Sequence, residues 1–307
     1  MGPVAMHGGV RTLTKRLLEG VVTLRPVVAR LKRRASGASI ILAYHNVLPE
    51  GEEVSGSPGA HLRLSDFRWQ LDLLEELGTV VPVEHLLDPR SPTEGLRVAL
   101  TFDDAYVGTL EVALPELEAR GLPSTVFVPT GLVGRGAFWW DALGISGWEG
   151  ERVPLEELRG DGGRIRSWAE SRGIVVRPQG RSQVASTEEG ILRSQRFSGV
   201  TFGVHTVGHP NLTRLSPEEI ESELTGARKW LLERSLPECS WLSYPYGLTS
   251  PRVEEVARSL GFPAAVTITG GWIPPQPANR LRLPRLPVPA GLSREGFLLR
   301  LLGVIRG

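Results

Sequence analysis

The chain alternates between continuous apolar runs and segments in which apolar residues recur at helical spacing. Residues 38–47 (ASIILAYHNV) and 96–102 (LRVALTF) are nearly all apolar, which is typical of strands buried on both faces. Between them, residues 64–78 place Phe67 and Leu71 one helical turn apart, and further leucines continue the same face. Strand-like and helix-like segments keep alternating beyond this point, which predicts parallel βα units and an α/β fold.

Residues with strong end preferences mark where several of these helices begin and end. For the helix at 64–78, Ser65 is expected to be the N-cap and Gly78 to end it. A longer helix is expected to begin after Ser216, because Ser216 and Glu219 have the spacing of a capping box and a proline occupies the first helical position. The helix boundaries are thus predicted from local signals alone.

One segment interrupts the alternation of strands and helices. Residues 134–198 are rich in Gly, Arg, Glu and Ser and are too many for an ordinary βα loop. We expect this segment to be an insertion over the functional site or a small subdomain. The chain then divides into an N-terminal segment at 1–37, a barrel domain at 38–290 that carries the insertion, and a C-terminal helix at 291–307. The proline-dense stretch 274–289 is expected to be extended.

Charge is unevenly distributed along the chain. The net charge of +1 argues against bulk nucleic-acid binding, but residues 1–39 hold eight Lys and Arg and one acid, Glu19. Apolar residues lie between these charges, so residues 10–34 are expected to form either a basic helix on an anionic membrane surface or a solvated helix packed on the domain. No run has transmembrane length, and Arg25-Pro26 interrupts the best apolar stretch. We therefore expect no cleavable signal peptide and a cytoplasmic protein, peripheral on the inner membrane face under the first alternative.

Two adjacent carboxylates, Asp103 and Asp104, close the second of the apolar strands. Carboxylates placed side by side at the end of a buried strand cost free energy unless a cation neutralises them. His205 and His209 follow the next clear strand, and in a helical turn residues four apart share one face, so both imidazoles could hold the same ion. The chain has one cysteine, Cys239, which excludes a cysteine zinc cluster. One Asp and two His leave coordination positions open, as a catalytic metal requires.

These residues resemble the polysaccharide deacetylase family, also called carbohydrate esterase family 4 or the NodB homology domain. The sequence TFDDAY is similar to the first family motif, usually TFDDG, with Ala105 in place of the glycine. The resemblance implies that Asp103 is the general base and Asp104 a metal ligand. HTVGH is similar to the second motif, which implies that His205 and His209 are the other two ligands.

A third stretch, SYPYG, resembles the third family motif, commonly R-x-P-Y-G or A-Y-P-Y-G. By that resemblance Tyr246 places a backbone N–H on the reaction oxyanion and Pro245 shapes the groove wall. The arginine that steadies the base in many members is replaced by Ser243. This departure puts the full activity of the site in question.

The late family motif that carries the general acid is missing, because no histidine follows His209. The early stretch ILAYHNV instead resembles the circularly permuted branch that contains the poly-N-acetylglucosamine deacetylases, and it implies that His45 is the general acid. RLPRLPV resembles the same branch, in which a late basic residue supports the site, so Arg282 and Arg285 are candidates. The resemblance covers residues 40 to about 288 and implies a distorted (β/α)7 barrel with its catalytic groups at the carboxyl ends of the strands.

Four residues beyond these motifs are candidates for substrate contact. Trp139 and Trp140 could stack on a sugar or belong to the core, and Asp141 could orient a catalytic partner or cap a helix. Tyr106 is expected to be a wall residue of the site. Three histidines without such neighbours are expected on the surface or in loops: His7, His61 and His85.

The expected function is metal-dependent removal of N-acetyl groups from an N-acetylated sugar, polysaccharide or glycolipid, with release of acetate. The metal, most simply Zn²⁺ with Co²⁺, Ni²⁺ or Fe²⁺ as alternatives, would polarise the acetyl carbonyl and activate water. Asp103 would take a proton from the water, and His45 would protonate the departing amine. Two alternatives remain, an O-acetyl esterase and an impaired carbohydrate-binding protein, the latter favoured by Ser243 and Ala105.

Overall fold

The computed structural model describes residues 33, 37–88, 95–143, 153–274 and 276–304. Most of the expected basic N-terminal segment, including nearly all of residues 10–34, lies outside the described residues, and so does His7. Within the described ranges, none of the helices combines the length and the apolar character that a membrane crossing requires.

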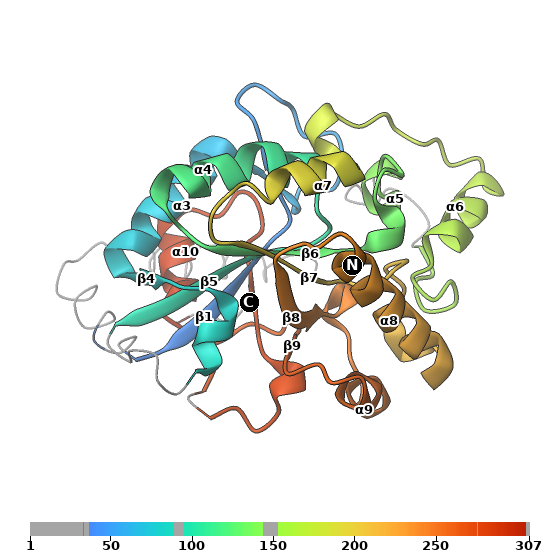
Figure 1. The fold of residues 1–307 in the computed structure, drawn as a ribbon. Helices are drawn as coiled ribbons and strands as arrows, with labels where there is room; N and C mark the ends of the chain where they lie inside the picture. The colour runs from blue at the N-terminus through green and yellow to red at the C-terminus, as the bar shows by residue number, and fades with distance from the viewer. Residues whose placement is uncertain (1–32, 34–36, 89–94, 144–152, 275, 305–307) are drawn as a thin grey trace, which may run out of the picture.

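A curled parallel sheet forms the centre of the molecule (Figure 1). Its strands follow the order β10-β1-β5-β6-β7-β8-β9, and β4 pairs with the first half of β5. The strand bounds are β1 Ser39–Tyr44, β4 Gly78–Val80, β5 Leu96–Phe102, β6 Ser124–Val128, β7 Val200–Val204, β8 Glu238–Ser243, β9 Ala265–Val266 and β10 Leu286–Pro287. A separate small sheet pairs β2 (Asn46–Leu48) with β3 (His61–Arg63).

A short segment closes the sheet into a distorted barrel. Leu283 forms a parallel bridge to Val266 of β9, and three residues later β10 pairs with β1. The expectation of a distorted (β/α) barrel is therefore confirmed, and the first strand lies beside the last. The proline-dense stretch is extended at this closing segment but forms a 3₁₀ turn just before it, η7 (Arg280–Arg282).

The alternation of side chains explains why the central strands are apolar throughout. All seven residues of β5 are buried. Val98 and Leu100 pack in the cluster between the sheet and the helices, whereas Ala99 packs in a second cluster with Ile41 and Phe127. Successive residues of a strand point to opposite faces, so both faces of the strand are buried.

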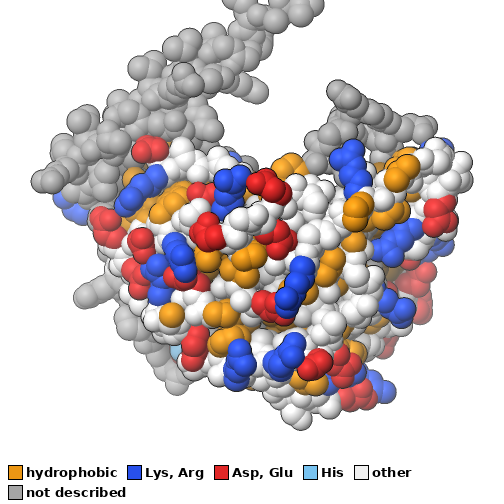
Figure 2. Space-filling view, turned by 90° about the horizontal axis from the view of Figure 1, so that it is seen from above, with side chains coloured by type: hydrophobic (Ala, Val, Ile, Leu, Met, Phe, Trp, Pro, Cys, Tyr) orange, Lys and Arg blue, Asp and Glu red, His pale blue; other side chains and the backbone are white. Residues whose placement is uncertain are grey.

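Helices cover the outside of the sheet (Figure 1). Their bounds are α3 Leu64–Leu77, α4 Leu114–Arg120, α8 Pro217–Glu233, α9 Pro251–Ser259 and α10 Arg294–Leu301, and a π-helical turn, η2 (Thr109–Ala113), precedes α4. Shorter 3₁₀ turns are η1 Val83–Leu87, η3 Thr130–Leu132, η5 Leu212–Arg214 and η6 Pro245–Gly247. Figure 2 shows basic and acidic side chains intermixed on one face of the molecule, as expected for a chain whose net charge is close to zero.

The predicted helix ends are confirmed in part. The capping box of α8 is present, because the Ser216 side chain accepts from the Glu219 backbone N–H and the Glu219 side chain accepts from the Ser216 N–H. Gly78 ends α3 and approaches the Leu96 carbonyl so closely that a Cβ would overlap it. The prediction of Ser65 as N-cap is wrong: α3 begins at Leu64, directly after β3, with extended Arg63 as its N-cap.

The insertion at 134–198 lies between β6 and β7 and carries its own short helices. They are α5 Trp139–Ala142, α6 Gly162–Glu170, η4 Arg181–Gln183 and α7 Glu188–Ser194, and Figure 1 shows α6 at the outer edge of the fold. The insertion pairs with the turn after β5, where Tyr106 bridges to Ala185. It is therefore anchored next to the two adjacent aspartates.

The first predicted strand, at 38–47, is divided in the structure. β1 ends at Tyr44 and β2 begins at Asn46, where the chain leaves the barrel to pair with β3. His45 occupies the point of separation and is half-buried. A continuous apolar pattern could not reveal this break, since both strands are buried.

Candidate active site

Six candidate residues meet where the parallel strands end. They follow β1, β5, β7 and β8, and the carboxyl ends of these strands share one edge of the sheet. Together they line a cleft of about 380 Å³, and they are His45, Asp103, Asp104, His205, His209 and Tyr246.

Asp104, His205 and His209 form a buried group with the geometry of a metal site. The Asp104 Oδ1 atom lies 3.6 Å from His205 Nε2 and 3.7 Å from His209 Nε2, too far for hydrogen bonds. Asp104 Oδ1 has no hydrogen-bond partner although it is buried. Tetrahedral ligands about 2.1 Å from an ion lie roughly 3.4 Å apart. The three donor atoms therefore fit a divalent cation.

The surroundings of these ligands favour the protonation states that a cation needs. His205 Nδ1 donates to the Ser243 carbonyl at 2.8 Å, which leaves Nε2 with a free lone pair facing Asp104. Burial lowers the pKa of both histidines, and His205 further lowers the pKa of His209. Burial, with Asp103 and Asp141 nearby, raises the pKa of Asp104 well above its usual range, and a cation would oppose that shift.

The expectation that the two histidines share a helical turn is wrong. They lie in an irregular turn after β7, where Thr206 has φ 68° and His209 has φ 57°. The Thr206 hydroxyl accepts from the His209 N–H at 2.9 Å. Glu223 of α8 accepts from the two intervening backbone N–H groups, each at 2.8 Å. This turn brings the imidazole centroids to 4.8 Å, so the pairing is achieved without a helix.

Left-handed backbone is concentrated around the cleft. Seven described residues other than glycine have positive φ, and five of them lie in the turns that carry the site. These five are Asp104, Ala105, Thr206, His209 and Tyr246. Such a conformation costs a residue with a Cβ roughly 1–2 kcal/mol. Ala105, with φ 51°, shows why a glycine suits that position of the first motif.

Asp103 is held by a buried arginine, Arg285, which lies outside the third motif. Arg285 donates to both carboxylate oxygens of Asp103, at 2.8 and 2.6 Å, and to the Ser243 hydroxyl at 2.9 Å. The Ser243 hydroxyl in turn lies 3.2 Å from Asp103 Oδ1. Burial alone would raise the pKa of Asp103, but Arg285 and His205 lower it well below its usual range. Asp103 is therefore ionised near neutral pH.

The other residues expected from the motifs differ in how close they lie to the cleft. The Tyr246 ring lies 4.7 Å from the His209 ring, and its hydroxyl donates to the Gly160 carbonyl at 3.0 Å. Pro245 is buried at the start of η6. Arg282 is half-exposed and pairs with Glu254 at 2.6 Å, so it does not reach the cleft. His45 lines the cleft, and burial lowers the pKa of His45 while Asp103 opposes that shift.

The insertion borders the cleft through Trp139, Trp140 and Leu155. The Trp140 ring lies 4.8 Å from the His209 ring, and its Nε1 donates to the Tyr106 hydroxyl at 2.7 Å. Tyr106 is fully buried and lies behind Trp140 rather than in the cleft wall.

Asp141 and His61 form a buried pair that sequence reasoning missed. Asp141 does not cap a helix, because it lies inside α5, and it contacts His61 at 3.1 Å. The prediction of a surface or loop position for His61 is wrong, since it lies in β3 and is 1% exposed, whereas His85 is exposed as expected. Further cleft residues were also missed; they are Gly247 at the end of the third motif, and Ser57, Gly59, Ala60, Leu155 and Ile268 from segments without a motif.

Comparisons of the sequence and of the fold show which known proteins this chain is similar to. The Bacillus subtilis protein YxkH, named as a candidate polysaccharide deacetylase, is 23% identical over 264 residues, which cover 84% of this chain and 74% of YxkH. The Streptococcus pyogenes deacetylase PplD, solved in complex with acetate, shares the fold with a TM-score of 0.60 and 21% identity, covering 86% of this chain and 98% of PplD. IcaB from Ammonifex degensii gives a TM-score of 0.58 and 21% identity, covering 87% and 96%. The family model described as polysaccharide deacetylase matches residues 90–265, more than half of the chain, and the protein therefore belongs to the polysaccharide deacetylase family.

Proposed function

We propose that this carbohydrate deacetylase is a metal-dependent hydrolase that removes N-acetyl groups from the sugars of a glycan or glycolipid and releases acetate. One observation carries the proposal: three cation-ligand atoms, an ionised aspartate and a histidine line one cleft. Amide hydrolysis needs a nucleophile, a site for the negative charge of the tetrahedral state, and a proton for the amine. The cleft offers a group for each.

Asp104, His205 and His209 would hold the metal. A divalent ion bound there would supply Lewis acidity toward the acetyl carbonyl and toward water. One carboxylate and two imidazoles suit zinc first, and also cobalt, nickel or iron. The three protein ligands leave further coordination positions open, as catalytic rather than structural sites do.

Asp103 is proposed as the general base. Its carboxylate is kept ionised by Arg285. Because the Ser243 hydroxyl has a single hydrogen to donate, at least one carboxylate oxygen keeps a lone pair with which to accept a hydrogen bond from water. The low pKa of Asp103 also makes it a weak base. A base this weak needs an acidified water, which is a second reason to expect a cation on the neighbouring ligands.

His45 is proposed as the general acid and Tyr246 as the oxyanion donor. β1 lies beside β5, so His45 follows the strand next to the one that ends in the two aspartates. A half-buried imidazole at the cleft can pass a proton to the departing amine. The backbone N–H of Tyr246 would donate to the oxyanion, and a donor of this kind typically contributes about 3 kcal/mol.

The arrangement around Asp103 argues against the impaired-protein alternative. The arginine missing at Ser243 is matched by Arg285, whose guanidinium makes the contacts that a base-steadying arginine would make. A module that only binds sugars has no need of an ionised aspartate and a histidine beside three cation ligands.

The test is acetate release by the purified, zinc-loaded protein from N-acetylglucosamine oligomers, N-acetylated glycolipids and O-acetylated sugars. We expect release from an N-acetylated substrate and none after Asp103→Asn. Release from the O-acetyl esters alone would make the protein an esterase. Binding of the oligomers without release from any substrate would favour the carbohydrate-binding alternative.

A further inference from the structure

Asp141 is a fully buried carboxylate outside the group of proposed catalytic residues. It is 0% exposed, and among the described residues no lysine or arginine forms an ion pair with it. Its Oδ1 accepts from the Ser57 backbone N–H at 2.8 Å and lies 3.1 Å from His61 Nε2, and its Oδ2 accepts from the Tyr106 hydroxyl at 2.7 Å. Asp141 thus joins the loop after β2, strand β3 and the turn after β5 to the insertion.

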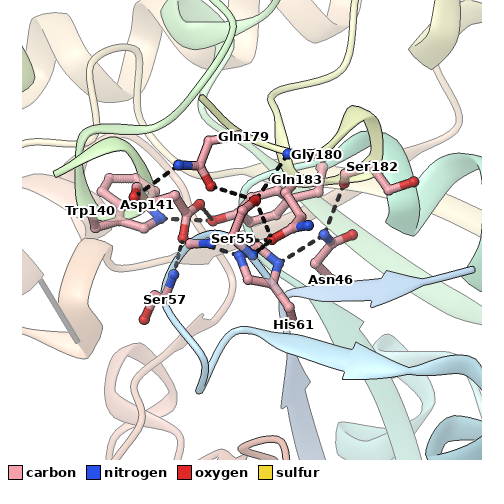
Figure 3. Close-up of polar contacts among 12 residues, drawn as sticks. Asn46, Ser55, Ser57, His61, Trp140, Asp141, Gln179, Gly180, Ser182 and Gln183 are labelled. Atoms are coloured by element: carbon pink, nitrogen blue, oxygen red, sulfur yellow. Dashed lines mark hydrogen bonds and ion pairs between the residues drawn. The ribbon is translucent and has the colours of Figure 1, made fainter. Parts of the chain in front are cut away.

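The orientation of His61 in this network is determined by its second neighbour. Asn46 Nδ2 lies 3.0 Å from His61 Nδ1 and donates to the Ser182 carbonyl at 2.9 Å (Figure 3). Because the Asn46 amide nitrogen is a donor, His61 Nδ1 accepts and Nε2 carries the hydrogen that points to Asp141. Figure 3 shows His61 between Asn46 and Asp141.

The loop that contacts Asp141 is fitted to it from a second side. Gln183 of η4 accepts from the backbone N–H groups of Ser55 and Gly56, at 2.8 and 3.2 Å. A Cβ on Gly56 would lie 2.5 Å from Asp141 Oδ1, so only glycine permits this approach. The loop is therefore held between Gln183 and Asp141.

Asp141 does not line the cleft, but two of its contacts lead to it, Ser57 directly and Tyr106 through Trp140. The Tyr106 hydroxyl accepts from Trp140 Nε1 at 2.7 Å, and the Trp140 ring lies beside His209 in the cleft wall. On the other side Ser57 lines the cleft together with Gly59 and Ala60. One carboxylate therefore links two separate parts of the wall.

A buried carboxylate with neutral donors is a poor way to stabilise a fold. Removing a carboxylate from water costs several kcal/mol, and apolar residues of similar volume are often more stabilising. The carboxylate here does what an apolar side chain cannot, since its oxygens accept from, and so fix, a specific backbone N–H and a specific phenol. The placement of Asp141 therefore favours a role in holding the wall in one arrangement.

We propose that Asp141 is a positioning residue for the sugar substrate, which it serves by holding Ser57 and, through Tyr106, Trp140 in the cleft wall. The substrate half of this proposal rests on the proposed deacetylase function. In this arrangement Ser57 and Trp140, which Asp141 positions, would contact the sugar rather than the attacking water. Loss of Asp141 is therefore expected to weaken substrate binding more than it slows the chemical step.

The experiment compares Asp141→Ala, Asp141→Asn and Tyr106→Phe with a matched control, Tyr44→Phe. The Tyr44 hydroxyl is buried and donates to Gln70 at 3.0 Å on the α3 side, away from the cleft. In zinc-loaded protein we expect KM for an N-acetylglucosamine oligomer to rise at least tenfold in Asp141→Ala and Tyr106→Phe, with kcat changed less than threefold. Asp141→Asn keeps an oxygen for Ser57 and should rescue part of the loss.

Amide hydrogen exchange gives a readout that needs no activity. The Ser57 amide should exchange at least tenfold faster in Asp141→Ala than in the wild type, and Tyr44→Phe should leave it unchanged. An unchanged Ser57 amide in Asp141→Ala, or kcat and KM effects equal to those of Tyr44→Phe, would overturn the proposal. If wild-type protein releases no acetate, the proposed function fails and the substrate half with it, while the exchange rate still decides whether Asp141 holds the wall.

Discussion

Arg285 contacts both carboxylate oxygens of Asp103, at 2.8 and 2.6 Å, although 182 residues separate the two in the chain. Arg285 lies in the segment that closes the barrel between β9 and β1, which directs its side chain toward the carboxyl end of β5. Ser243 stands where related motifs carry an arginine, and its hydroxyl contacts both groups. The guanidinium thus reaches Asp103 from the segment that directly precedes β10.

Arg285→Gln is expected to shift the acid limb of the pH–rate profile to higher pH. With its low pKa, Asp103 contributes stability above the usual aspartate range, and this contribution is lost as the pH falls through the folded-state pKa. Without the guanidinium, burial raises the pKa of Asp103, so both stability and activity should be lost at a higher pH. An uncompensated buried charge also costs about 3–5 kcal/mol.

The measurement is kcat/KM against pH, with thermal unfolding on the same samples. Arg285→Lys keeps the charge but loses the two-point contact, so its acid limb should lie between those of the wild type and Arg285→Gln. Superimposable acid limbs in all three proteins would show that Arg285 does not set the ionisation of Asp103.

Substitution of the proposed ligands is expected to empty the metal site. Asp104→Ala, His205→Ala and His209→Ala should each sharply lower the zinc content measured after dialysis, and activity should fall with it. Asp103→Asn should retain the metal and lose activity, because a general base is not a ligand. If Asp103→Asn also lost the metal, the roles of the two aspartates would have to be exchanged.

Glu223 is expected to support metal binding without being a ligand. One oxygen, Oε2, accepts both hydrogen bonds from the turn between the two histidines. Glu223→Ala should therefore weaken zinc affinity by about 10- to 100-fold, the usual effect of losing a group that orients ligands. Glu223→Gln keeps an equivalent oxygen and should lose much less.

Zinc titration by calorimetry can check this prediction, with exposed Glu221→Ala on the same helix as control. Equal affinities in Glu223→Ala and Glu221→Ala would mean that the turn holds its shape unaided.

His45→Ala is expected to lower turnover on an N-acetylated sugar by about 10²- to 10⁴-fold, the usual contribution of a general acid. Aryl acetate esters have leaving groups that need no proton, so their hydrolysis should fall far less, and zinc content should be unaffected. Parallel assays on both substrates decide the matter. Equal losses, or a stability loss large enough to explain the inactivity, would leave the proton donor unidentified.

Much of the fold could be predicted because its signals are local. The apolar run at 96–102 becomes a strand buried on both faces, and the Ser216–Glu219 capping box begins α8 as its spacing requires. The adjacent aspartates and the histidine pair also meet, because the carboxyl ends of parallel strands in one sheet share one edge of it. These features depend on nearest neighbours and on one general property of parallel sheets.

The sequence by itself therefore determined the barrel, its family and the Asp104, His205 and His209 group, whereas the tertiary structure decided which distant groups support it. Arg282 and Arg285 were equal candidates in the sequence. Only the strand pairing that closes the barrel turns Arg285 toward Asp103 and Arg282 toward Glu254. His61 carried no motif, and its burial follows from β2 leaving the barrel to pair with β3. Such partners are chosen by long-range packing, because a buried polar group must find its hydrogen bonds wherever the folded chain brings them.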